Sequence, residues 1–197
     1  MIDESKYNKH KDNASKLLSK SKKITFDIDS ETFQEMWNNS HSDIPIGEKD
    51  EDGNERKEQM GYFVLDLKKA KITLEVTNGE NNTHEKAPVS MYGNNNNSSR
   101  ETKLFYIDGT RNYLVIGTIH THPNTEAENY ERTPAKNTSD VRLSNIYDMP
   151  LYYFDDSNVD KITPSSLNDN YKSKSELMNG TFDIAKDTFK SFIDIHN

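Results

Sequence analysis

The sequence predicts an α+β fold, and three observations support this. Several segments alternate apolar and polar residues as β-strands do, and others carry apolar residues at helical spacing. The two kinds follow one another without the regular strand–helix–strand order of parallel α/β proteins. With 197 residues the chain is long enough for one domain with appendages. We expect a polar N-terminal arm over residues 1–22, a mixed sheet flanked by helices over residues 23–170 and a C-terminal helix over residues 171–197.

The composition excludes several classes of function. The chain has 33 acidic and 25 basic residues, a net charge of −8 and no Cys. Without Cys it has no thiol nucleophile, disulfide or thiolate metal site. The acidic balance without a basic cluster argues against a nucleic-acid partner, and no apolar run of about 18 residues is present to enter a membrane. The Lys-rich segment Met1–Lys23 lacks the apolar core of a secretory signal. We expect a cytoplasmic location, or export by a system independent of signal peptides; the oligomeric state stays open.

The first half of the expected domain contains a strand, a helix and a β-hairpin. Lys23–Ile28 alternates like a strand, and a helix begins at Ser30. The apolar face of this helix comprises Phe33, Met36 and Trp37. Tyr62–Leu67 and Lys71–Thr77 form the hairpin around a turn at two lysines. Residues 78–100 are rich in Asn and predict a long loop.

Two strands and a short helix are expected next. The strands cover Lys103–Ile107 and Tyr113–Ile119, and the second is almost entirely apolar. Such a strand is typically central and buried on both faces. After a polar loop over residues 124–136, Thr138 or Ser139 caps a helix that runs to Tyr147.

The last part of the chain predicts further strands and then helix. Leu151–Phe154 reads LYYF and is expected to be a strand whose aromatic residues lie in the core, and Lys161–Pro164 is a candidate for another. From Ser173 the apolar residues follow helical spacing, with an interruption at Gly180.

The segment with the clearest chemistry follows the central strand and reads GTIHTHP. In an extended chain residues i and i+2 point to the same side, so His120 and His122 present two imidazoles to one point. Pro123 ends the strand directly after them. Imidazoles suit zinc, iron and similar divalent metals, and an open catalytic zinc site needs three protein ligands. Asp140, at the start of the expected helix, is the natural third ligand. The alternative is a pair of exposed histidines at a loop edge that binds no metal.

Hydrolysis at such a site also needs a general base. Glu58 lies just before the strand Tyr62–Leu67, where a carboxylate can reach the edge of the core. Glu55 and Glu75 are competing candidates, and Glu58 could also be one more solvated charge in an acidic run.

Other metal sites built on a His-x-His pair fit this sequence less well. The facial triad of non-haem iron enzymes usually places its carboxylate two residues from one histidine, and neither His120 nor His122 has a carboxylate at that spacing. A cupin site needs a later Glu and a third His, and a metallo-β-lactamase site needs further His and Asp after the pair. No third His is well placed, because His84 precedes the pair and His196 is the next to last residue, and Pro123-Asn124 breaks the second pattern.

These motifs together resemble the JAB/MPN family with its JAMM metalloprotease motif. The shared features are a Glu-x-x-G segment before a strand, His-Thr-His-Pro about sixty residues later, and an Asp at a helix start. The resemblance covers roughly residues 55–165 and is closest to the JAB-like domains of bacterial polymorphic toxins and related proteins. It implies the cytidine-deaminase-like arrangement of that family, a mixed sheet flanked by helices.

The resemblance also implies a function and a role for each site residue. His120, His122 and Asp140 would hold Zn²⁺, and Glu58 would deprotonate the bound water and pass its proton to the leaving amine. Asn137 stands where the family has Ser, and its amide can donate a hydrogen bond to an oxyanion. The implied activity is zinc-dependent hydrolysis of amide or isopeptide bonds in a protein or peptide, with a bacterial toxin or effector as one setting. The alternative is a catalytically inactive JAB fold that serves as a binding or scaffolding module.

Overall fold

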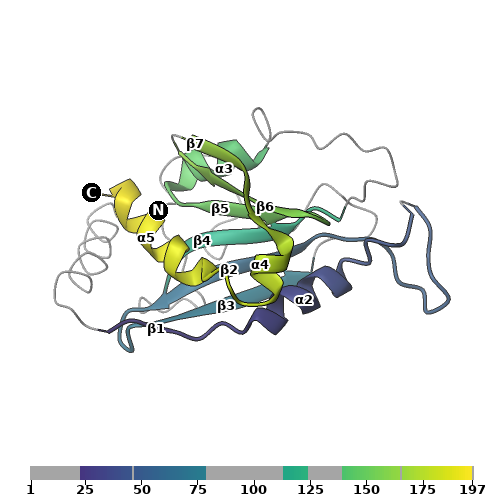
Figure 1. The fold of residues 1–197 in the computed structure, drawn as a ribbon, viewed down its shortest axis with the longest axis horizontal. Helices are drawn as coiled ribbons and strands as arrows, with labels where there is room; N and C mark the ends of the chain where they lie inside the picture. The colour runs from purple at the N-terminus through teal and green to yellow at the C-terminus, as the bar shows by residue number, and fades with distance from the viewer. Residues whose placement is uncertain (1–22, 46, 79–112, 124–138, 165, 197) are drawn as a thin grey trace, which may run out of the picture.

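The computed structural model describes residues 23–45, 47–78, 113–123, 139–164 and 166–196 (Figure 1). Several predictions from the sequence lie outside these residues. They are the arm over residues 1–22, the strand Lys103–Ile107, Asn137, and the loops over residues 79–100 and 124–136.

One mixed sheet organises the described residues, which confirms the α+β class. Its seven strands lie in the order β1-β3-β2-β4-β5-β6-β7. The pairs β1–β3 and β4–β5 are parallel, and the other neighbours are antiparallel. The strands are β1 (Thr25–Phe26), β2 (Gln59–Asp66), β3 (Lys71–Asn78), β4 (Tyr113–Thr121), β5 (Leu151–Phe154), β6 (Asn158–Thr163) and β7 (Ser166–Ser173).

Helices cover both faces of this sheet (Figure 1). They are α2 (Ser30–Asn39), α3 (Ser139–Tyr147), α4 (Lys174–Met178) and α5 (Ile184–His196). On one face, β5 contacts α5 and α2, through the hydroxyl of Tyr152 and the ring of Phe154 respectively. On the other face, Leu151, Tyr153 and Ile162 pack with Val141 and Leu143 of α3. None of the described helices has the length and apolar character needed to cross a membrane.

The strand β4 lies at the centre of the sheet, as predicted. Its residues from Leu114 to Thr121 are all buried. The strand runs two residues further than expected and therefore includes His120. Gly117 allows α5 to approach closely, because a Cβ at this position would lie 2.5 Å from Cγ2 of Thr188.

The first predicted elements form with small shifts in their ends. The N-terminal strand is only two residues long. The helix α2 begins at Ser30 and buries Phe33 and Met36, but its cap is Asp29, whose carboxylate accepts a hydrogen bond from Glu31 N at 3.0 Å. The hairpin of β2 and β3 is antiparallel as predicted, and β2 starts at Gln59, directly after Glu58.

The C-terminal part differs more from the prediction. The strand β7 was not expected, and helix begins at Lys174 rather than at residue 171. Ser173 ends the strand and caps α4, in a capping box with Glu176. The predicted interruption at Gly180 is confirmed: this residue adopts a left-handed conformation with φ of +74° and separates α4 from α5.

Candidate metal centre

The two histidines lie where β4 leaves the sheet. His120 pairs with Met60 of β2 and Tyr153 of β5 in the strand register, so it is enclosed on both sides. His122 follows the end of β4, and its backbone N–H donates to the carbonyl of Phe154 at 2.8 Å. This bond keeps the chain extended, so both imidazoles project to the same side, as the i, i+2 spacing predicted.

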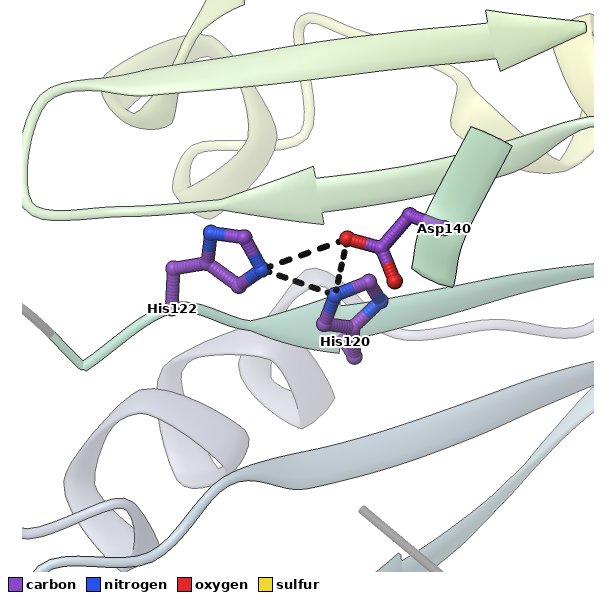
Figure 2. Close-up of side chains that lie close together, drawn as sticks. All are labelled: His120, His122 and Asp140. Carbon is purple, nitrogen blue, oxygen red and sulfur yellow. Dashed lines mark hydrogen bonds and ion pairs between the residues drawn. The ribbon is translucent and has the colours of Figure 1, made fainter. Parts of the chain in front are cut away.

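Asp140 approaches the histidines from α3, where it is the second residue of the helix. Figure 2 shows the two imidazoles and the carboxylate pointing at one another. The Nε2 atoms of His120 and His122 are 2.9 Å apart. Asp140 Oδ2 lies 3.5 Å from Nε2 of His120 and 3.6 Å from Nε2 of His122. The end of β4 and the start of α3 thus bring three ligand atoms to one point.

These separations fit a single metal ion. Zinc bonds of about 2.0–2.2 Å at tetrahedral angles place neighbouring donor atoms about 3.3–3.5 Å apart. The three observed distances of 2.9, 3.5 and 3.6 Å lie close to that range. Two imidazoles and one carboxylate also form a donor set suited to borderline divalent metals. The group of His120, His122 and Asp140 could therefore bind a metal ion.

The electrostatics of the group favour a positive charge at its centre. Burial opposes protonation of His120, but the charge of Asp140 and, more weakly, that of Glu58 outweigh it and raise the pKa of His120. Burial lowers the pKa of His122. Burial also opposes ionisation of Asp140, yet the two histidines hold the pKa of its carboxyl far below the usual range. Asp140 and His122 thus favour the ionised and the neutral state that metal ligands require, whereas His120 has to lose its proton when a metal binds.

Glu58 is a buried carboxylate beside this group. It is 4% exposed, so it is not one of the solvated charges of the acidic run. The next residue, Gln59, donates its backbone N–H to Oγ1 of Thr121 at 2.9 Å, which joins the start of β2 to the end of β4. Of the competing candidates, Glu75 is exposed and Glu55 is paired with Lys49 at 2.6 Å. Glu58 is therefore the better placed of the three.

Two residues that support the site were not singled out from the sequence. The Arg56 side chain is 2% exposed and donates to the carbonyls of Ile44 at 2.7 Å and Ser42 at 2.8 Å, which fixes the segment that leads into Glu58. Tyr153 was expected in the core, and its ring also lies against both histidines. An arginine in a charged run and an aromatic in a strand carry no sequence signal for such roles.

The arrangement of His120, His122 and Asp140 in this structure is the evidence for a metal site. Asn137, the expected oxyanion donor, lies outside the described residues. The resemblance to the JAB/MPN family depends on the sequence motif and stays a prediction. Comparisons of the chain with family models, with curated proteins and with solved structures give no match.

Proposed function

We propose that this protein is a zinc-dependent hydrolase of amide or isopeptide bonds in a protein or peptide substrate, of the JAB/MPN type. The observation that carries the proposal is the convergence of His120, His122 and Asp140 on one point. The buried carboxylate of Glu58, whose charge acts on His120, adds a candidate base. Two imidazoles and a carboxylate leave one tetrahedral position for the reacting water.

The roles of the residues follow from their chemistry. Zn²⁺ held by the three ligands would act as a Lewis acid and lower the pKa of a water molecule. Glu58 would take a proton from the attacking water on a carboxylate oxygen and deliver it to the nitrogen of the leaving amine. The side-chain amide of Asn137 would donate a hydrogen bond to the oxygen that becomes negative during attack.

Metal content tests the first half of the proposal. The purified protein is expected to contain about one zinc per chain by elemental analysis after exposure to Zn²⁺. His120→Ala and Asp140→Ala each remove one of the three ligands and should lose most of this metal. The same metal content in the wild type and in both variants would contradict the site.

Activity tests the second half. Glu58→Gln keeps the size of the side chain but cannot accept a proton, so hydrolysis of peptide or isopeptide substrates should fall roughly 10²–10⁴-fold. The variant should keep its zinc, because Glu58 is not among the proposed ligands. A wild type that binds zinc but hydrolyses no more than Glu58→Gln would instead support an inactive binding module. Asn137 at the position of the family's Ser is the observation that favours this second function.

A further inference from the structure

The ring of Tyr153 forms a surface beneath the two histidines. It is stacked on the His122 imidazole, with ring centroids 4.3 Å apart and an angle of 22° between the planes. The His120 imidazole is further away, with centroids 5.9 Å apart and planes at 36°. Tyr153 therefore covers one face of His122 in a near-parallel arrangement, which is a favourable geometry for aromatic pairs.

His122 is the ligand that most needs such support. It lies beyond the last residue of β4, and its side chain is 25% exposed, against 6% for His120. The hydrogen bond from its backbone N–H to Phe154 holds the main chain but leaves the side-chain torsions free. The imidazole edge meets Asp140 and His120, so the contact with Tyr153 is what fixes the plane of the ring.

Tyr153 itself is held firmly. It is 1% exposed and lies in β5, between β4 and β6, with His120 and Asp160 as its register partners. On the face toward α3 it packs in one cluster with Leu151 and Ile162, both buried. A ring in such a setting has one orientation and can impose it on a neighbour.

We propose that Tyr153 is a positioning residue for the metal centre: its ring, rather than its hydroxyl, holds the His122 imidazole in the plane that metal binding requires. This inference rests on the metal-binding half of the proposed function. When residues that contact metal ligands and fix their orientation are replaced, the metal affinity commonly falls 10–100-fold. The same scale is expected here for loss of the ring.

The test compares two substitutions at Tyr153. Tyr153→Phe keeps the ring and removes the hydroxyl, so its affinity for Co²⁺ and Zn²⁺ should stay within about threefold of the wild type. Tyr153→Leu removes the ring, so its affinity should fall roughly 10–100-fold. Titration of the metal-free protein with Co²⁺, followed by its visible absorption, reports both the affinity and the coordination geometry. Displacement by Zn²⁺ gives the second affinity.

A matched control separates positioning from general damage to the fold. Phe63→Leu makes a similar change in volume in β2, but Phe63 packs against Tyr152 on the face of the sheet toward α5, with ring centroids 6.1 Å apart. It should lower the thermal midpoint about as much as Tyr153→Leu, while its Co²⁺ affinity and spectrum stay those of the wild type. If Tyr153→Leu does not fold, Tyr153→Met provides a flexible apolar replacement.

The outcomes distinguish this inference from the proposed function. A wild type that binds neither Co²⁺ nor Zn²⁺ would overturn both. Binding by the wild type, with equal affinities in Tyr153→Leu and Phe63→Leu, would overturn only the role of Tyr153. An equal loss in Tyr153→Phe and Tyr153→Leu would assign the effect to the hydroxyl and would also overturn the role of the ring.

Discussion

Thr118 is a buried polar residue next to the metal centre, two residues before His120 in β4. Its side-chain oxygen has no hydrogen-bond partner among the described residues. It lines a cavity of about 10 Å³ between the sheet and α3, which is at the lower limit for holding one water molecule. The remaining lining residues, most of them apolar, are Met60, Leu143, Ser144, Tyr147, Met149 and Leu151. Burial removes hydration from this hydroxyl, and no bond to a described residue offsets that cost.

Replacement of Thr118 by Val should stabilise the protein. Valine has nearly the same shape and suits a strand, and it removes the unsatisfied hydroxyl, so we expect the free energy of unfolding to rise by about 1 kcal/mol. Urea denaturation measures this change. Thr121→Val is the matched control in the same strand: its hydroxyl accepts the N–H of Gln59 at 2.9 Å, so the same change should lower the free energy by about 1–2 kcal/mol. A similar loss in Thr118→Val would mean that a water molecule satisfies its hydroxyl.

The residues of the metal centre differ in how far the sequence predicts them. The common direction of His120 and His122 follows from their spacing in an extended chain, and the structure confirms it. Asp140 was predicted as the third ligand because it stands at the start of the expected helix. Its position in space depends on how α3 packs across β5 and β6, which sequence spacing does not determine. The stacking of Tyr153 on His122 could not be predicted, because it depends on the register between two strands that are parallel and far apart in sequence.

At the scale of elements, the contact between β4 and α5 depends on the absence of a side chain at Gly117. A Cβ there would lie 2.5 Å from Cγ2 of Thr188 and 3.0 Å from the backbone oxygen of Pro150. The first atom belongs to a buried side chain of α5, and the second belongs to the main chain before β5. Neither can move far, so α5 lies as close to the central strand as its own atoms allow.

Gly117→Ala should therefore destabilise the protein by about 1–3 kcal/mol through overpacking. Thr188→Ser removes the Cγ2 atom and retains a hydroxyl that can still donate to the carbonyl of Ile184, as Thr188 does at 2.7 Å. Because it relieves the closer of the two contacts, the double variant should recover part of the loss, and a double-mutant cycle in chemical denaturation measures the coupling. Strict additivity of the two single changes would argue that α5 does not meet β4 at this point.

The elements that the sequence predicted well are those with an apolar pattern. The strand β4 and the strand β5 are nearly continuous apolar segments in the centre of the sheet, and both were confirmed. The strand β7 reads SLNDNYKS and has exposed and half-buried residues throughout. It lies at the edge of the sheet, where hydrogen bonds to β6 hold it and only Leu167 and Tyr171 pack against the core. The sequence of such a segment does not predict a strand, because Asn and Asp are rare in strands.

At the scale of the whole molecule, one carboxylate ties the C-terminal helix to three strands. Oδ2 of Asp187 in α5 accepts hydrogen bonds from the hydroxyl of Tyr152 in β5 and from Nζ of Lys161 in β6, both at 2.6 Å. Its Oδ1 accepts the hydroxyl of Tyr171 in β7 at 2.9 Å. The side chains of Lys161 and Asp187 are 10% and 19% exposed, so the ion pair is largely shielded from solvent.

These contacts make the stability of the fold depend on pH at both extremes. Burial opposes the charge of Asp187, but its bonds to Lys161 and the two tyrosines outweigh it and lower the pKa of Asp187. A lowered carboxyl pKa gives stability that is present above the unfolded value of about 3.9 and is lost as the pH falls through the folded value. Burial and Asp187 raise the pKa of Tyr171 to about 12. The stability from a raised tyrosine pKa is present below about pH 10 and is lost as the pH rises toward 12.

Asp187→Asn should therefore show a destabilisation that is largest near neutral pH. Breaking the pair leaves Lys161 largely buried without its carboxylate, so we expect a loss of about 3 kcal/mol at pH 7. The gap between variant and wild type should narrow below about pH 4, where the wild-type carboxylate begins to bind a proton, and above about pH 10, where the tyrosines ionise in the unfolded chain. Urea midpoints from pH 3 to 11 measure the difference in stability between the variant and the wild type.

Asp183→Asn is the control. It makes the same change beside the start of α5, in an exposed pair with Lys186, and should cost less than about 1 kcal/mol. A gap for Asp187→Asn that stays constant from pH 3 to 11 would show that the charge of this residue does not hold α5 to the sheet.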